Sequence, residues 1–228
     1  MSSRRIARAV SAVVVTAWAL LSAPFDIPSA SAAPCPDVEV VFARGTTEPP
    51  GIGGVGQAFV DALRSQVGAR SVGVYPVNYP ATDDYAQSAS AGASDAGTHV
   101  QSMASNCPNT RMVLGGYSQG ALVIDLITAV PVPIAGFTPA PMPPEVADHV
   151  AAVAVLGNPS ARYVGVPLNV VSPLYGAKAV DLCAPGDPIC SPGGNMSPSR
   201  DEMFPAAHLS YVQSGMARQA ATFAASRL

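Results

Sequence analysis

Two hydrophobic periodicities alternate along this chain of 228 residues. Short and almost continuous apolar runs are typical of strands buried on both faces; they cover 37–43, 71–80, 111–117, 149–159 and 178–183. Stripes with apolar residues three or four positions apart predict helices over 55–67, 85–105, 119–129 and 211–228. Strands that alternate with helices predict one α/β domain, in which a parallel sheet lies between helical layers.

The first 32 residues have the pattern of a secretory signal peptide. Three arginines form a basic start, residues 9–21 are uncharged and mostly apolar, and Ala30-Ser31-Ala32 offers a cleavage site between small residues. The apolar run is too short to span a bilayer comfortably, which disfavours the alternative of a retained membrane anchor. We therefore expect an exported protein, in the medium or the cell wall, with residues 33–228 as its single domain.

The charge of the chain excludes one class of partner. Lys178 is its one lysine, and the formal net charge is −3. Removing the predicted leader also removes three arginines and makes the balance more acidic. Because nucleic acid binding needs clustered cations, we expect no nucleic acid partner.

The cysteines predict two disulfides. An even number of cysteines in an exported chain favours disulfides over free thiols, and here they are Cys35, Cys107, Cys183 and Cys190. Counting alone allows three pairings, but local spacing favours Cys183 with Cys190, which leaves Cys35 with Cys107. The chain has no Cys-x-x-Cys pair and its histidines are scattered, so we expect no metal and no other cofactor.

A serine between a predicted strand and a predicted helix is the first candidate for chemistry. The stretch Gly116-Tyr117-Ser118-Gln119-Gly120 fits G-x-S-x-G, the sharp turn that exposes the nucleophile of α/β hydrolases. The motif alone is weak, but its place between a strand and a helix is the context that it needs. Ser118 is therefore the candidate nucleophile.

A serine nucleophile needs a histidine base, and this fold orders the residues as serine, acid and histidine. His99 precedes Ser118 and fails that order. His149 follows it but stands at the entrance to a buried strand, where a structural role is favoured. His208, in a loop before the last helix, is the candidate base.

The acid that orients the histidine should lie between the fifth strand and His208. Asp181 belongs to that strand, and Asp201 and Glu202 stand in an expected exposed loop. Asp187 lies inside "CAPGDPIC", just beyond the carboxyl end of a strand, where ligand sites of such sheets lie. We favour Asp187 as the orienting acid over the alternative of a solvated turn aspartate.

Two backbone donors should stabilise the oxyanion. One is the N–H of Gln119, which follows the nucleophile. The other should come from the loop "ARGTTE" after the first strand, where Thr46 could offer its N–H and its hydroxyl. An ordinary loop threonine is the alternative for Thr46.

These segments together resemble the cutinase family, over essentially the whole mature chain. The resemblance is carried by "FARGTTE", "GGYSQG", "CAPGDPIC" and a histidine some twenty residues later, and it is closest to actinobacterial cutinase-like exported esterases. It implies a small, lidless α/β hydrolase with a five-stranded parallel sheet and a Ser118–Asp187–His208 triad. It also implies an oxyanion hole from Thr46 and Gln119 and the two disulfides given above. Thr46 departs from fungal cutinases, which usually carry serine there.

The expected activity is therefore hydrolysis of short-to-medium acyl esters, including lipid or polyester, by a secreted monomeric serine esterase. Apolar residues near the expected rim, in "PVPIAGFTPAPM", favour an acyl chain over a sugar. The alternatives are an acetylxylan-type polysaccharide deacetylase, a serine peptidase, and a catalytically silent secreted binding protein or antigen.

Overall fold

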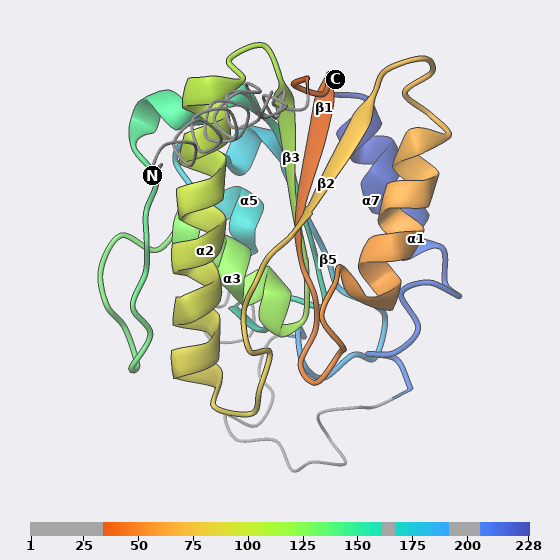
Figure 1. Cartoon of the computed structure of the whole chain (residues 1–228). Coiled ribbons are helices and arrows are strands. Elements are labelled where there is room, and N and C mark those ends of the chain that lie inside the picture. Colours follow the sequence, from red (N-terminus) through yellow and green to blue (C-terminus); the bar gives the residue numbers. More distant parts are fainter. Residues whose placement is uncertain (1–33, 161–166, 192–205) are drawn as a thin grey trace, which may run out of the picture. The chain divides into compact units, whose positions relative to one another are not determined.

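Five parallel strands form the centre of the domain, in the order β2-β1-β3-β4-β5 (Figure 1). The computed structural model describes residues 34–160, 167–191 and 206–228. The strands are β1 Val38–Ala43, β2 Val72–Pro76, β3 Arg111–Tyr117, β4 Val150–Leu156 and β5 Ala179–Leu182. The predicted five-stranded parallel sheet is confirmed, and β1 and β4 are buried along their whole length because helices cover both faces.

Helices form a layer on each face of this sheet (Figure 1). One layer contains α1 Gly53–Arg64 and α7 Met216–Ala225, and the other contains α2 Tyr85–Asn106 and α3 Gln119–Thr128. Side chains alternate between the layers along each strand: Phe42 packs with the first and Val41 with the second. The short elements η1 Pro144–His149, α5 Leu168–Val171 and η2 Gly176–Lys178 lie in the connections.

The structure corrects several predicted boundaries: β2 ends at Pro76 and β4 at Leu156, before the expected ends at 80 and 159. The last helix was expected from residue 211 but begins at Met216, because turns occupy 206–214 and Gly215 adopts the left-handed φ of 78°. His149 ends η1 instead of opening β4. The predicted leader lies outside the described residues. Within the described part of the chain, no helix is both long and apolar enough to cross a membrane.

The strand register brings distant loops to one edge of the sheet. Ala43, the last residue of β1, pairs with Gly116 near the end of β3. The loop after β1 therefore emerges beside the turn that contains Ser118. Since all strands are parallel, the chain after β4 and β5 reaches the same edge, where ligand sites of such sheets lie.

A buried carboxylate, Asp125, and a partly buried one, Asp181, meet beside this edge. The Asn158 side-chain amide donates hydrogen bonds of 3.0 Å to Asp125 of α3 and of 3.0 Å to Asp181 of β5. Asp181 also accepts the Leu168 N–H, whereas Asp125 Oδ1 is buried without a hydrogen-bond partner. Burial, reinforced by the neighbouring charge of Asp181, raises the pKa of Asp125 to about 7. The folded protein therefore holds a proton on Asp125 that the unfolded chain releases near pH 4.

This proton makes folding stability depend on pH. Between pH 4 and pH 7 the unfolded state binds fewer protons at Asp125 than the folded state, so the free energy of unfolding falls as pH rises. For one group the slope is at most about 1.4 kcal/mol per pH unit. We expect Asp125→Asn to flatten the pH dependence of urea unfolding between pH 5 and pH 7. The exposed Asp61→Asn serves as the control, and a slope unchanged by Asp125→Asn would contradict the expectation.

Candidate active site

Ser118 occupies a strained turn between β3 and α3. Its φ of 54° and ψ of −120° lie in a region that residues with a side chain rarely adopt. The flanking glycines make this turn possible. A side chain on Gly116 would collide with the Gly120 carbonyl, and one on Gly120 would collide with the Ala43 carbonyl at the end of β1. The G-x-S-x-G pattern thus reflects how closely α3 approaches β1.

The structure brings Ser118, His208 and Asp187 together from three segments. Ser118 Oγ lies 2.9 Å from His208 Nε2, and His208 Nδ1 lies 2.8 Å from Asp187 Oδ2. All three residues are largely buried; Ser118 is 8% exposed. The distances fit a histidine that takes a proton from the serine while a carboxylate holds the opposite ring nitrogen.

Hydrogen bonds keep Asp187 ionised although it is fully buried. Burial raises the pKa of a carboxyl group, but here the hydrogen bond and charge of His208 outweigh that effect. The Tyr211 hydroxyl donates to Asp187 Oδ2 at 2.7 Å and the Ile189 N–H donates to Oδ1 at 2.9 Å. The net result is that the pKa of Asp187 lies below its ordinary value.

A short disulfide loop carries Asp187. The Cys183–Cys190 bond closes it, and inside it the Asp187 N–H donates to the Ala184 carbonyl at 2.9 Å. The second disulfide joins Cys35 to Cys107 near the start of β1. Among the described residues, Cys183, Asp187 and Cys190 are the one group of three or more residues whose side-chain atoms lie close enough together to share a metal ion. Both sulfur atoms belong to the disulfide, so this set does not fit a metal ion.

The His208 ring is enclosed by aromatic residues. Tyr117 stacks on it with ring centroids 5.1 Å apart and donates its hydroxyl to the His208 carbonyl at 2.6 Å. Tyr211 meets the ring edge-on. Gly157, after β4, leaves room for the imidazole, because a Cβ there would lie 2.8 Å from His208 Cε1.

The loop after β1 holds the second candidate oxyanion donor. Thr46 is buried there, and its hydroxyl donates to the Tyr85 hydroxyl at 3.2 Å. Glu48 ties the loop together: its two carboxylate oxygens accept the N–H groups of Gly45 and Gly54 at 2.6 and 2.8 Å. The loop is therefore fixed in shape before any ligand binds.

Gln119 anchors the other side of the candidate oxyanion site. Its side chain is fully buried, donates to the Thr82 carbonyl at 2.8 Å and accepts the Ser88 hydroxyl at 3.1 Å. These bonds connect the residue after the candidate nucleophile to the segment that leads into α2. Its backbone N–H is thereby held at the first turn of α3.

The remaining histidines and acids lie elsewhere. His99 of α2 stacks on Tyr75 and lies 3.2 Å from a Glu39 oxygen. His149 contacts the Pro108 carbonyl, before the start of β3. Asp181 contacts Asn158 as described above, and Asp201 and Glu202 lie outside the described residues.

Sequence reasoning missed three residues of this arrangement: Tyr117, Tyr211 and Glu48. Tyr117 stands inside the G-x-S-x-G motif and Glu48 inside "ARGTTE", so both were in view without a role. Tyr211 follows His208 by three residues, a spacing that could have indicated contact with the same acid.

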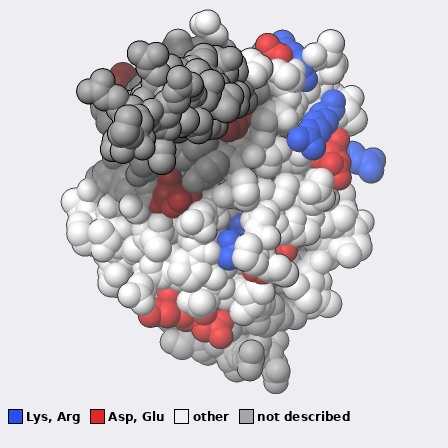
Figure 2. All heavy atoms as spheres, viewed as in Figure 1, with Lys and Arg blue, Asp and Glu red and all other residues white. Residues whose placement is uncertain are grey.

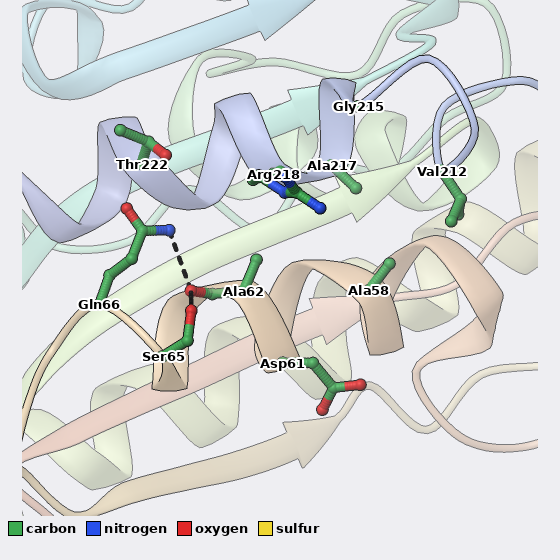
Figure 3. Close-up of a pocket in the computed structure, with 10 residues that line it drawn as sticks. All are labelled: Ala58, Asp61, Ala62, Ser65, Gln66, Val212, Gly215, Ala217, Arg218 and Thr222. Carbon is green, nitrogen blue, oxygen red and sulfur yellow. Dashed lines mark hydrogen bonds between the residues drawn. The ribbon is translucent and has the colours of Figure 1, made fainter.

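A separate groove of about 510 Å³ lies between α1 and α7 (Figure 3). Small and polar side chains form most of its lining, and the charged Asp61 and Arg218 stand at its sides. Ser118, Asp187 and His208 do not line it. We assign this groove no role in the chemistry of the site.

Comparison with known proteins relates the whole described domain to one family. The family model described as Cutinase matches residues 34–228. Carboxylesterase Culp1 of Mycobacterium tuberculosis is 54% identical, over 100% of this chain and 98% of the relative. Phospholipase Culp4 of the same organism is 52% identical, over 100% and 93%. A solved acetylxylan esterase is 27% identical with a TM-score of 0.70, over 85% of this chain and 99% of that one.

The hydroxyl of Tyr211 gives a direct test of the site geometry. We expect Tyr211→Phe to lower kcat on a soluble ester about 3- to 30-fold, because Asp187 loses a donor that holds its carboxylate in place against His208. The pKa of Asp187 then rises, and the more basic carboxylate stabilises the protonated form of His208. The acidic limb of the pH–rate profile therefore moves to higher pH.

Tyr175→Phe is the matched control for this change, since the Tyr175 hydroxyl is buried without a partner. It should leave kcat and the pH profile as they are. A Tyr211→Phe enzyme that loses only melting temperature, with an unmoved profile, would contradict a role in positioning Asp187.

Proposed function

Because this chain is a carboxylic ester hydrolase of the cutinase family, we propose that it cleaves acyl esters through a covalent intermediate on Ser118. The observation that supports this most strongly is the chain of short contacts from Ser118 Oγ through His208 to Asp187. The same three residues match the family motifs noted in the sequence.

In the proposed reaction, Ser118 Oγ attacks the ester carbonyl carbon while its proton passes to His208 Nε2. The resulting imidazolium gives that proton to the alcohol oxygen as the bond from carbonyl carbon to alcohol breaks. Water then attacks the acyl-enzyme, with His208 again taking the proton, and Ser118 is regenerated as the acid product leaves. Asp187 remains ionised throughout and holds the imidazole by its Nδ1–H.

We assign the oxyanion hole to the N–H groups of Thr46 and Gln119. Each such donor is typically worth about 3 kcal/mol in the transition state. The carboxylate of Glu48 supports this assignment, because it fixes the loop that contains Thr46. The Gln119 side chain does the same for the first turn of α3.

The proposed substrates are short-to-medium-chain acyl esters, with lipid esters included. The names of two relatives, a carboxylesterase and a phospholipase, support ester chemistry and the inclusion of lipid esters. Structural similarity to an acetylxylan esterase supports a second candidate, removal of acetyl groups from a polysaccharide. We further propose that residues 1–32 are a leader and that the enzyme acts as an exported monomer, as two disulfides would allow.

Substitution of Ser118 tests the nucleophile. We expect Ser118→Ala to lower kcat/KM by at least about 10⁴-fold without loss of fold, because the triad works as a unit. His208→Ala should have a comparable effect. The matched control is His149→Ala, which should retain activity provided that it folds. If folded His149→Ala were inactive while His208→Ala stayed active, His149 and not His208 would be the base.

A series of p-nitrophenyl esters tests the substrate class. We expect kcat/KM to be highest for short-to-medium acyl chains and to exceed that for an acetylated polysaccharide measured beside them. The reason is the apolar, uncharged segment 131–144, expected at the rim of the site. Preference for the polysaccharide would favour the deacetylase instead.

A further inference from the structure

Residues 131–137, which we call the apolar hairpin, expose large apolar side chains to solvent. Val132 is 61% exposed and Ile134 is 58% exposed. No charged residue occurs between Asp125 and Glu145, so nothing in this stretch favours water over an apolar environment. Contiguous exposed apolar surface of this kind marks an interaction site more often than an accident of folding.

The hairpin is held in place on its inner side. Ile134 and Phe137 exchange backbone hydrogen bonds around a turn in which Ala135 and Gly136 both have positive φ, as a two-residue turn of type I′ requires. Phe137 packs against the core, and the next residue, Thr138, donates its N–H to Ser90 Oγ at 2.9 Å. The outward direction of Val132 and Ile134 is therefore fixed by the fold.

The tip of the hairpin lies beside the candidate active site. In Figure 1 this green loop runs down along α2 to the end where the helix begins. A Cβ on Gly136 would lie 3.6 Å from the side chain of Ala86 in the first turn of α2. The preceding residue, Tyr85, accepts the Thr46 hydroxyl. A surface that contacts the tip of the hairpin therefore also lies close to the candidate oxyanion loop, which contains Thr46.

The charges around the hairpin define its partner further. Asp83 and Asp84, just before α2, are exposed. Figure 2 shows acidic side chains at the lower edge of this face, whereas most basic side chains gather at its upper right. Of the described basic residues, Arg70 and Lys178 precede their strands and Arg111 is the first residue of β3, so all three lie at the opposite edge of the sheet. An anionic surface would be repelled here.

We propose that the apolar hairpin inserts Val132 and Ile134 into a lipid surface without net charge, and so holds the candidate active site against it. The proposal rests on the proposed esterase function only in one respect, that lipid esters held at the surface would be substrates for Ser118. Contact between the hairpin and the lipid surface itself requires no catalysis. Burial of two β-branched apolar side chains in the acyl region supplies the attraction.

The test is vesicle flotation in a Ser118→Ala background, which leaves the lipid intact. Phosphatidylcholine vesicles are compared with vesicles that also contain phosphatidylglycerol. We expect Val132→Ser with Ile134→Ser to lower partitioning onto phosphatidylcholine at least about tenfold. The matched control, Val170→Ser with Leu174→Ser, changes two side chains that are 63% and 45% exposed elsewhere and should bind like the parent.

A second measurement uses the same hairpin variant with Ser118 intact. Its kcat/KM on a water-soluble acetyl ester should equal that of the parent, whereas hydrolysis of a vesicle-bound ester should fall. Inactivity of the parent on every ester would overturn the proposed function alone, because flotation does not depend on it.

Three results would overturn the lipid proposal. The first is undiminished flotation of the hairpin variant, and the second is binding that requires phosphatidylglycerol. The third is a parent that ignores vesicles but forms a dimer that the hairpin variant loses in sedimentation. That result would assign the hairpin to a second copy of the chain.

Discussion

The close approach of α3 to the end of β1 is the constraint on which the candidate site depends. The backbone at Gly120 lies against the carbonyl of Ala43, with no space for a side chain between them. This contact fixes the sharp turn at Ser118 and its unusual φ. It also places the loop that contains Thr46 beside the first turn of α3. One packing contact thereby positions both the candidate nucleophile and its candidate oxyanion donors.

The other half of the site depends on a buried charge. A fully buried Asp187 would normally favour its neutral form, yet donors from His208, Tyr211 and Ile189 hold it ionised. The disulfide loop supplies the backbone for this arrangement. Asp125, a few residues beyond Ser118 in α3, shows the opposite case: one of its oxygens has no partner, and burial raises its pKa despite the hydrogen bonds it accepts. Two buried aspartates in one domain thus differ in charge because they differ in donors.

The sequence allowed much of this to be predicted. The alternation of apolar runs and helical stripes was enough to predict the parallel sheet, because strands buried on both faces are almost continuously apolar. The order of serine, acid and histidine set aside His99, and the place of each remaining candidate along the chain favoured Asp187 and His208, which the structure brings next to Ser118. The order of the strands in the sheet and the start of the last helix could not be predicted from the sequence. Strand register and the left-handed conformation of Gly215 depend on tertiary packing. The roles of Tyr211 and Glu48 were also missed, because a hydrogen bond to a carboxylate or a loop N–H leaves no periodic signal.

The central claim is that Ser118 is activated by His208 at this turn. It is tested most directly by reaction with a fluorophosphonate, followed by mass spectrometry of the digested protein. We expect one adduct, on the peptide that contains Ser118, formed rapidly in the parent and very slowly in His208→Ala. An adduct on a different serine, or labelling of Ser118 that proceeds equally fast without His208, would contradict the claim.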